Sequence, residues 1–94
     1  MNRRLQYISL GRAGKMVYQD AISAISFDYE FGGGNCIAII FIPSAENWTS
    51  ATNRPIADRN DVLNYVAGKA TADQVSDGYF VISERFIEIF KKKL

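Results

Sequence analysis

Residues 25–42, ISFDYEFGGGNCIAIIFI, decide the fold because their two arms follow different patterns. Residues 25–31 alternate apolar and polar side chains, which is typical of a strand with one buried face and one solvated face. Residues 36–42 are apolar at every position, which predicts a strand buried on both faces. The glycines and Asn35 between them predict a tight turn. We therefore expect a β-hairpin whose second strand lies inside the sheet.

An even-length turn sets which residues of this hairpin face each other. With two or four residues in the turn, Phe31 lies opposite Cys36 and Tyr29 lies opposite Ala38. Continuing the register forms one apolar face that packs against the rest of the core: Ile25, Phe27, Tyr29, Cys36, Ala38, Ile40 and Ile42. The other face carries an apolar stripe bordered on one side by the charged and polar side chains of the first strand: Ile37, Ile39 and Phe41.

The rest of the chain adds strands around this hairpin. Residues 5–10 and 15–19 predict the two strands of a short hairpin. The segment between them begins with Gly11 and ends with Gly14, which is typical of a turn. Residues 79–82 predict another strand. Residues 85–90 fit either a strand or a helix, and we favour the strand because Ile and Phe prefer pleated surfaces. Residues 43–57 predict a long connection that Trp48 pins to the core.

One clear helix follows that connection. Its apolar residues recur at helical spacing: Val62, Leu63, Val66, Ala67 and Ala70. Asp58 or Asn60 is suited to cap its start, and Gly68 is either an interior residue or its end. A capping-box pattern from Thr71 predicts a second short helix to about residue 76. Together these elements predict a single α+β domain over residues 1–94. It has one antiparallel, meander-like sheet of about five to six strands, with one main helix on one face.

Composition excludes several classes of protein. The 94 residues carry 11 basic and 10 acidic side chains, so there is no global charge that favours nucleic acid or an anionic membrane. The basic run at residues 91–93 is too short to change that expectation. The single Cys36 fits a reducing compartment, and residues 1–4 lack the apolar segment of a signal peptide behind them. We expect a cytoplasmic protein that does not span a membrane.

The sequence contains no histidine and one cysteine, which leaves little for metal or nucleophilic chemistry. We therefore expect no cofactor, no metal site and no catalytic residue. Cys36 begins a buried strand, so we interpret it as a packing residue, with a reactive thiol as the alternative. Asp28 and Glu30 project from one face of a strand. We interpret them as a solvated face, and an enzyme using these carboxylates or a tyrosine is the third and weakest of three functions.

Trp48 has two interpretations. It is either a lid on the open end of the core or the wall of a ligand pocket. Arg54 and Arg59 flank the start of the helix and offer cations for an anion there, although solvated arginines or pairs with Asp58 or Asp61 are the simpler interpretation. A small-molecule site near Trp48, Arg54 and Arg59 is therefore the second function we consider.

The apolar stripe gives the first function. One helix cannot cover both faces of a sheet, so Ile37, Ile39 and Phe41 need a second covering layer. The C-terminal segment, a sheet curled into a barrel or another chain are the available covers. In so short a chain we favour another chain, which predicts a homodimer or a protein-interaction module that uses this face.

The order of elements resembles a group of small proteins. A hairpin, a loop with Trp48, a helix with Arg59 and Val62-Leu63, and a closing strand pair around Gly78-Tyr79 follow one another over residues 15–90. This pattern resembles small uncharacterised bacterial α+β proteins carried on mobile gene cassettes (integrons) or acting as immunity proteins. The resemblance implies an accessory role and transfers no site residue.

Overall fold

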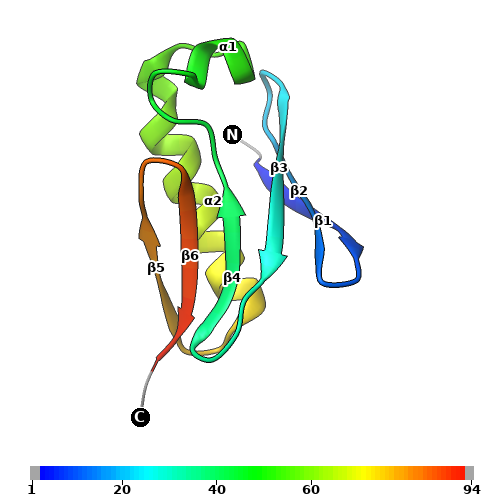
Figure 1. Cartoon of the computed structure of the whole chain (residues 1–94). Coiled ribbons are helices and arrows are strands. Elements are labelled where there is room, and N and C mark those ends of the chain that lie inside the picture. Colours follow the sequence, from blue (N-terminus) through cyan, green and yellow to red (C-terminus); the bar gives the residue numbers. More distant parts are fainter. Residues whose placement is uncertain (1–2, 93–94) are drawn as a thin grey trace.

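The computed structural model describes residues 3–92, which form one antiparallel sheet backed by a main helix (Figure 1). The strands are β1 (Arg4–Leu10), β2 (Ala13–Gln19), β3 (Ala24–Phe31), β4 (Cys36–Phe41), β5 (Gly78–Ile82) and β6 (Phe86–Lys91). Between β4 and β5 lie α1 (Trp48–Thr52), the 3-10 turn η1 (Ile56–Asp58) and α2 (Arg59–Gln74). The strand order is β1-β2-β3-β4-β6-β5, so β1 and β5 are the edges. The expected α+β fold is confirmed.

The core lies between one face of the sheet and α2. The five apolar helix residues expected to be buried are all at most 1% exposed. Facing them are the inward side chains of the central strands, including Phe27, Tyr29, Ala38 and Ile40. The predicted packing face is therefore confirmed, with Cys36 as its exception, because Cys36 is only half-buried.

The central hairpin differs from the expected register by two residues. Tyr29 pairs with Ile40 and Phe31 pairs with Ala38, so the expected partners, Ala38 and Cys36, were wrong. The turn extends through Cys36, whose N–H donates to the Gly33 carbonyl, while the Gly32 N–H donates to the Ile37 carbonyl. A two-residue shift keeps every side chain on its predicted face.

The sheet is narrow at its middle. β2 and β3 pair along seven residues of each strand, whereas β3 and β4 pair only between Tyr29–Phe31 and Ala38–Ile40. Beyond that contact the two strands separate, and α1 lies at the end where they diverge (Figure 1). Trp48 at the start of α1 is completely buried within the core cluster. The short helix therefore closes the end of the core that the sheet leaves open.

Other expectations are partly corrected. The first hairpin is confirmed, with Gly11 in a left-handed conformation (φ 76°) at its turn. Residues 85–90 fall largely within strand β6, as favoured. The connection over 43–57 is not free of regular structure, because it contains α1 and the start of η1. The second short helix from Thr71 was wrong: α2 continues through Gly68 to Gln74, and the Thr71 hydroxyl donates to the Ala67 carbonyl.

Two further expectations concern the ends and the membrane. Lys91 ends β6, and Lys93 of the basic run lies outside the described residues. Within residues 3–92, no helix has both the length and the apolar character needed to cross a bilayer.

Candidate interaction surface

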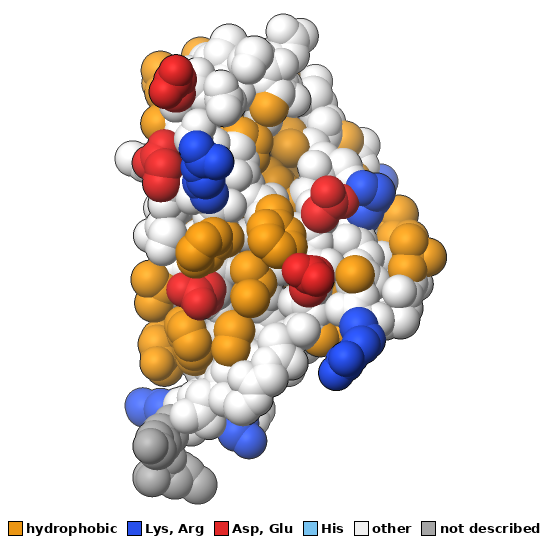
Figure 2. All heavy atoms as spheres, viewed as in Figure 1, with side chains coloured by type: hydrophobic (Ala, Val, Ile, Leu, Met, Phe, Trp, Pro, Cys, Tyr) orange, Lys and Arg blue, Asp and Glu red, His pale blue; other side chains and the backbone are white. Residues whose placement is uncertain are grey.

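The face of the sheet opposite α2 carries an apolar patch. Its residues come from three neighbouring strands, β4, β6 and β5, and we call them the open-face patch: Ile39, Phe41, Tyr79, Val81, Phe86 and Phe90. Four of them remain substantially exposed: Tyr79 (51%), Val81 (43%), Phe41 (41%) and Phe86 (36%). Figure 2 shows these strands from that side, with hydrophobic side chains gathered in the middle of the face.

Strand pairing explains why the patch is continuous. Phe41 pairs with Phe86 across β4 and β6, and Tyr79 pairs with Phe90 across β5 and β6. The Tyr79 and Phe90 rings stack, with centroids 5.2 Å apart. Aromatic side chains directly opposite each other on one face of a sheet contact favourably. The patch is therefore built by cross-strand pairs and not by scattered apolar residues.

Acidic side chains divide and border the patch. Glu88 lies between Ile39 and Val81, because it pairs with both. Glu30 pairs with Ile39 from the β3 side. Beside it, Asp28 accepts a 2.6 Å bond from the ammonium group of Lys15 on β2. The face is therefore apolar around the central carboxylate of Glu88 and acidic toward β3, where Lys15 pairs with Asp28.

A shallow hollow lies at the same margin. Its volume is about 350 Å³, and the side chains around it come from β1, β2, β3 and β4: Leu10, Ala13, Lys15, Asp28, Glu30 and Phe41. Apolar side chains thus lie next to one charged pair. Such a mixture is typical of the rim of a protein–protein interface.

The three stripe residues expected to form an interface take different positions. Phe41 is exposed within the open-face patch, and Ile39 is half-buried within it. Ile37 is also half-buried but packs against the core cluster. A β-bulge between Cys36 and Ala38 interrupts the β4–β6 pairing at this point. The patch therefore starts at Ile39 and extends toward β6 and β5.

Sequence patterns alone do not predict the remaining patch residues as part of an interface. Tyr79 and Val81 alternate along β5, and Phe86 and Phe90 occupy one face of β6. The alternation was visible, and it placed Phe86 and Phe90 together if this segment is a strand. What was not visible is that β6 lies beside β4, which brings their side chains next to Phe41.

The other candidate residues, near Trp48, are occupied by structural contacts. The Trp48 indole N–H donates to the Pro55 carbonyl at 3.1 Å, and its ring is completely buried. Arg59 donates to the backbone carbonyls of Pro43 (3.1 Å) and Glu84 (2.9 Å). These contacts tie the connection after β4 to the β5–β6 turn. Both side chains thus hold the closed end of the core together.

Arg54 belongs to a buried polar cluster that the sequence did not reveal. Its guanidinium forms 2.6 Å and 3.0 Å bonds to both carboxylate oxygens of Asp20, and it also bonds the Ser23 hydroxyl and carbonyl. The Tyr18 hydroxyl donates to Asp20 at 2.7 Å. We call Tyr18, Asp20, Ser23 and Arg54 the Asp20–Arg54 cluster.

Electrostatics in this cluster follow from these contacts. The Arg54 bond holds the pKa of Asp20 far below its usual range, and the Asp20 bond raises the pKa of Arg54. Burial, followed by the bond to Asp20, raises the pKa of Tyr18 to about 12. The three titratable groups, Tyr18, Asp20 and Arg54, are therefore held in one charge state over the physiological pH range. A buried and fully paired ion network behaves in this way for structural reasons.

Cys36 also fits its structural interpretation. Its thiol donates a weak bond to the Ala38 carbonyl at 3.7 Å. Burial, together with the nearby charge of Glu88, raises the pKa of the thiol. A raised pKa lowers the thiolate fraction and with it the reactivity of the sulfur.

Comparison with known proteins gives no further guide to function. No family model, no curated protein and no solved structure matches the chain.

Proposed function

We propose that this protein is an interaction module whose open-face patch binds a protein surface, with a second copy of the chain as the first partner. The observation that carries the proposal is the continuous run of exposed aromatic and aliphatic side chains on one face of the sheet. Single exposed apolar residues are ordinary, but contiguous patches on small proteins often mark binding sites.

The size of the patch supports association. The four most exposed members leave about 300 Å² of mostly apolar surface accessible, a lower limit for the whole patch. Burial at about 25 cal/mol per Å² favours binding by about 7 kcal/mol per copy, before the entropy cost of association. This contribution is large enough to matter for a dimer at micromolar concentration.

The charges on the face give the proposal its specificity. Glu30 and Glu88 border Ile39, so a partner that sets basic side chains around an apolar centre fits this face. The second copy offers Lys15 at the margin of its own patch. Two copies rotated against each other therefore supply both signs of charge to the same interface.

An accessory, cytoplasmic role completes the proposal. The resemblance to small proteins of mobile gene cassettes and immunity proteins suggests such a role, and the single Cys36 suggests a reducing compartment. Trp48, Arg54 and Arg59 serve the module by holding the closed end of the core. We therefore place no small-molecule site at that end.

Ile39→Lys tests the proposal. Lysine at the centre of the patch replaces an apolar contact by a charged side chain, which the second copy would have to desolvate even beside Glu30 and Glu88, so we expect association to weaken more than 100-fold and the mass of the assembly to halve. Sedimentation equilibrium from 1 to 500 μM measures the mass. Ser26→Lys is the matched control, because Ser26 is exposed on β3 outside the patch.

Circular dichroism checks that both variants keep the fold. The proposal predicts that Ile39→Lys lowers the mass and that Ser26→Lys leaves it unchanged. Equal masses for wild type and Ile39→Lys at every concentration contradict self-association through the patch.

A further inference from the structure

Strand β5 forms an edge of the sheet without the usual protection. Its sequence, Gly78-Tyr79-Phe80-Val81-Ile82, contains no charged residue and no proline. Natural edge strands are commonly protected by such residues, because an uncovered edge pairs with another chain. The opposite edge, β1, begins with Arg4. The two edges of this sheet are therefore not equivalent.

The pairing of β5 with β6 shows which backbone groups point outward. The Ser83 N–H donates to the Phe86 carbonyl, and the Lys92 N–H donates to the Asp77 carbonyl. In an antiparallel ladder, residues with inward-pointing and outward-pointing groups alternate. Residues 77, 79, 81 and 83 thus direct their groups toward β6. Gly78, Phe80 and Ile82 direct theirs to the open edge.

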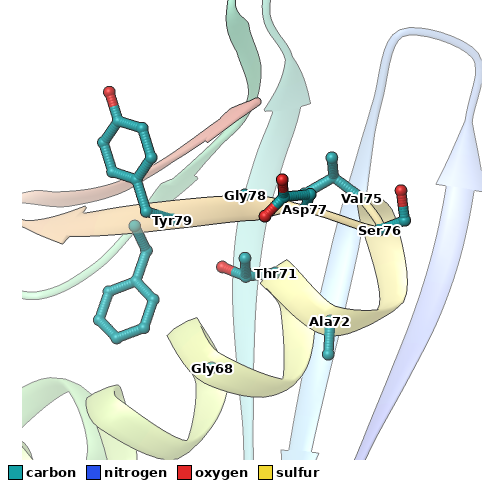
Figure 3. Close-up of a pocket in the computed structure, with 9 residues that line it drawn as sticks. Gly68, Thr71, Ala72, Val75, Ser76, Asp77, Gly78 and Tyr79 are labelled. Atoms are coloured by element: carbon teal, nitrogen blue, oxygen red, sulfur yellow. The ribbon is translucent and has the colours of Figure 1, made fainter. Parts of the chain in front are cut away.

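A hollow lies between this edge and α2. Its volume is about 450 Å³, and Gly68, Thr71 and Ala72 of α2 form its floor next to Gly78 and Phe80 of β5. Figure 3 shows these helix residues beneath β5, with Tyr79 on the other side of the strand. A side chain added at Gly68 meets no atom within 4 Å. The helix surface along this hollow is therefore open.

The β1 side of α2 is closed in contrast. The Arg3 guanidinium bonds Asp61 of α2 at 2.7 Å, and the Tyr7 hydroxyl donates to Asp73 of α2 at 2.7 Å. Arg3 also lies over the ring of Tyr65. These contacts bridge β1 and the helix, whereas the β5 side has the hollow in the corresponding place. Polar side-chain contacts thus hold the β1 side against α2, whereas a hollow lies between β5 and α2.

We propose that a second copy of this chain docks at the β5 edge, so that two sheets join into one across an antiparallel β5–β5 seam. A two-fold axis at Phe80 fits the outward groups. It sets Phe80 opposite Phe80 of the second copy and Gly78 opposite its Ile82, which yields about six backbone hydrogen bonds. Exposed Tyr79 then lies opposite Val81 of the second copy, an aromatic and β-branched pair of the kind that stabilises sheets.

The hollow fits the same arrangement. α2 lies behind the sheet and contacts both β5 and β6 (Figure 1). Joining the two β5 edges brings the hollow of one copy beside the same hollow of the second copy. Gly68 and Ala72, which line it, leave room there for side chains of the second copy.

Charge also permits the seam. Residues 78–82 are uncharged, so no like charges meet between the paired strands. Antiparallel pairing sets Asp77 of one copy opposite Ser83 of the other, and Glu84 beside that serine accepts the Ala45 N–H of its own chain. The charged residues thus lie beyond the ends of the paired segment.

The seam shares Tyr79 and Val81 with the open-face patch but uses the edge of the sheet instead of its face, and Ala72→Lys separates the two. Ala72 is exposed on α2 and does not belong to the patch, so lysine there puts a charged side chain into the hollow beside the seam without changing the face. We expect the variant to weaken association across the seam more than 10-fold and to halve the assembly mass in sedimentation equilibrium. Ala51→Lys, at an exposed position of α1, is the matched control and leaves the mass unchanged.

A cross-linking experiment tests the register. In a Cys36→Ser background, Tyr79→Cys combined with Val81→Cys should form intermolecular disulfides under mild oxidation, because the seam sets these positions opposite each other. The background variant alone should give none. An unchanged mass for Ala72→Lys, or a double variant that does not cross-link, overturns the seam. Loss of mass in Ile39→Lys but not in Ala72→Lys leaves the open-face proposal standing and rejects this one.

Discussion

At the scale of single residues, Asp20 makes more hydrogen bonds than its place in a short loop suggests. Its carboxylate accepts bonds from Arg54, Tyr18 and the backbone N–H groups of Ile22 and Ser23. The side chains of both Asp20 and Arg54 are almost completely buried. A buried cation that loses its partner is costly, because the interior cannot solvate it.

Removing Asp20 should therefore destabilise the protein strongly. For Asp20→Ala we expect a loss of about 3–5 kcal/mol in the free energy of unfolding at pH 7, since Arg54 stays buried without its counter-ion. Asp28→Ala is the control, because the Lys15–Asp28 pair is exposed and such pairs contribute at most about 1 kcal/mol. Urea titration measures both, and similar losses in the two variants contradict the structural role of the Asp20–Arg54 cluster.

The difference in unfolding free energy between wild type and Asp20→Ala depends on pH, and the lowered pKa of Asp20 sets its sign. Because the pKa of Asp20 is lowered by folding, the unfolded chain binds its proton first as the pH falls. The contribution of Asp20 is complete above the ordinary aspartate pKa, about 4, and decreases below it. The difference between wild type and Asp20→Ala should therefore shrink in acid.

Arg54 was visible in the sequence as a candidate residue, whereas its partner was not. Asp20 lies 34 positions earlier, in the turn between β2 and β3. No local pattern connects two segments that meet only after the sheet and α1 have formed. The sequence could therefore identify an interesting arginine but not whether it binds a ligand or a carboxylate of its own chain.

At the scale of elements, the central hairpin shows what alternation can and cannot specify. Alternation in residues 25–31 fixed the faces, and the faces were confirmed. The pairing depends on where the turn ends, which composition does not show. Gly34 adopts a left-handed conformation (φ 62°), and the turn includes Cys36. The observed register therefore differs from the expected one by two residues, while the buried face of the hairpin is the one expected.

Gly32 should be the sensitive position of this turn. A side chain there would overlap the Cys36 carbonyl oxygen, which is part of the backbone and cannot rotate away. We expect Gly32→Ala to cost about 1–3 kcal/mol in thermal or urea unfolding. Gly33→Ala is the control, since an added Cβ meets nothing within 4 Å. Equal stability of the two variants would show that the turn is built differently.

Helix α2 was predictable in its buried face and less so in its length. The periodic residues from Val62 to Ala70 are all buried, because periodicity reports packing directly. Gly68 and Thr71 suggested an end and a new start. Packing against β5 and β6 outweighs these weak local signals and extends the helix to Gln74.

At the scale of the whole molecule, a single main helix on a six-stranded sheet leaves one face without cover. The sequence pointed to this imbalance through a strand that is apolar on both sides. It did not reveal the strand order, which places β6 between β4 and β5 and assembles the patch from three strands. The patch could therefore be anticipated at Ile39 and Phe41 but not at Tyr79, Val81 or Phe86.

The most direct test of the central proposal is hydroxyl-radical footprinting of the wild-type protein across concentration, read by mass spectrometry. If the open-face patch binds a second copy, oxidation of Phe41 and Phe86 should fall several-fold between 1 and 500 μM. Ile56, which is 52% exposed in η1 and lies outside the patch, should stay constant as the internal control. Unchanged oxidation of Phe41 and Phe86 over this range would contradict self-association through the open face.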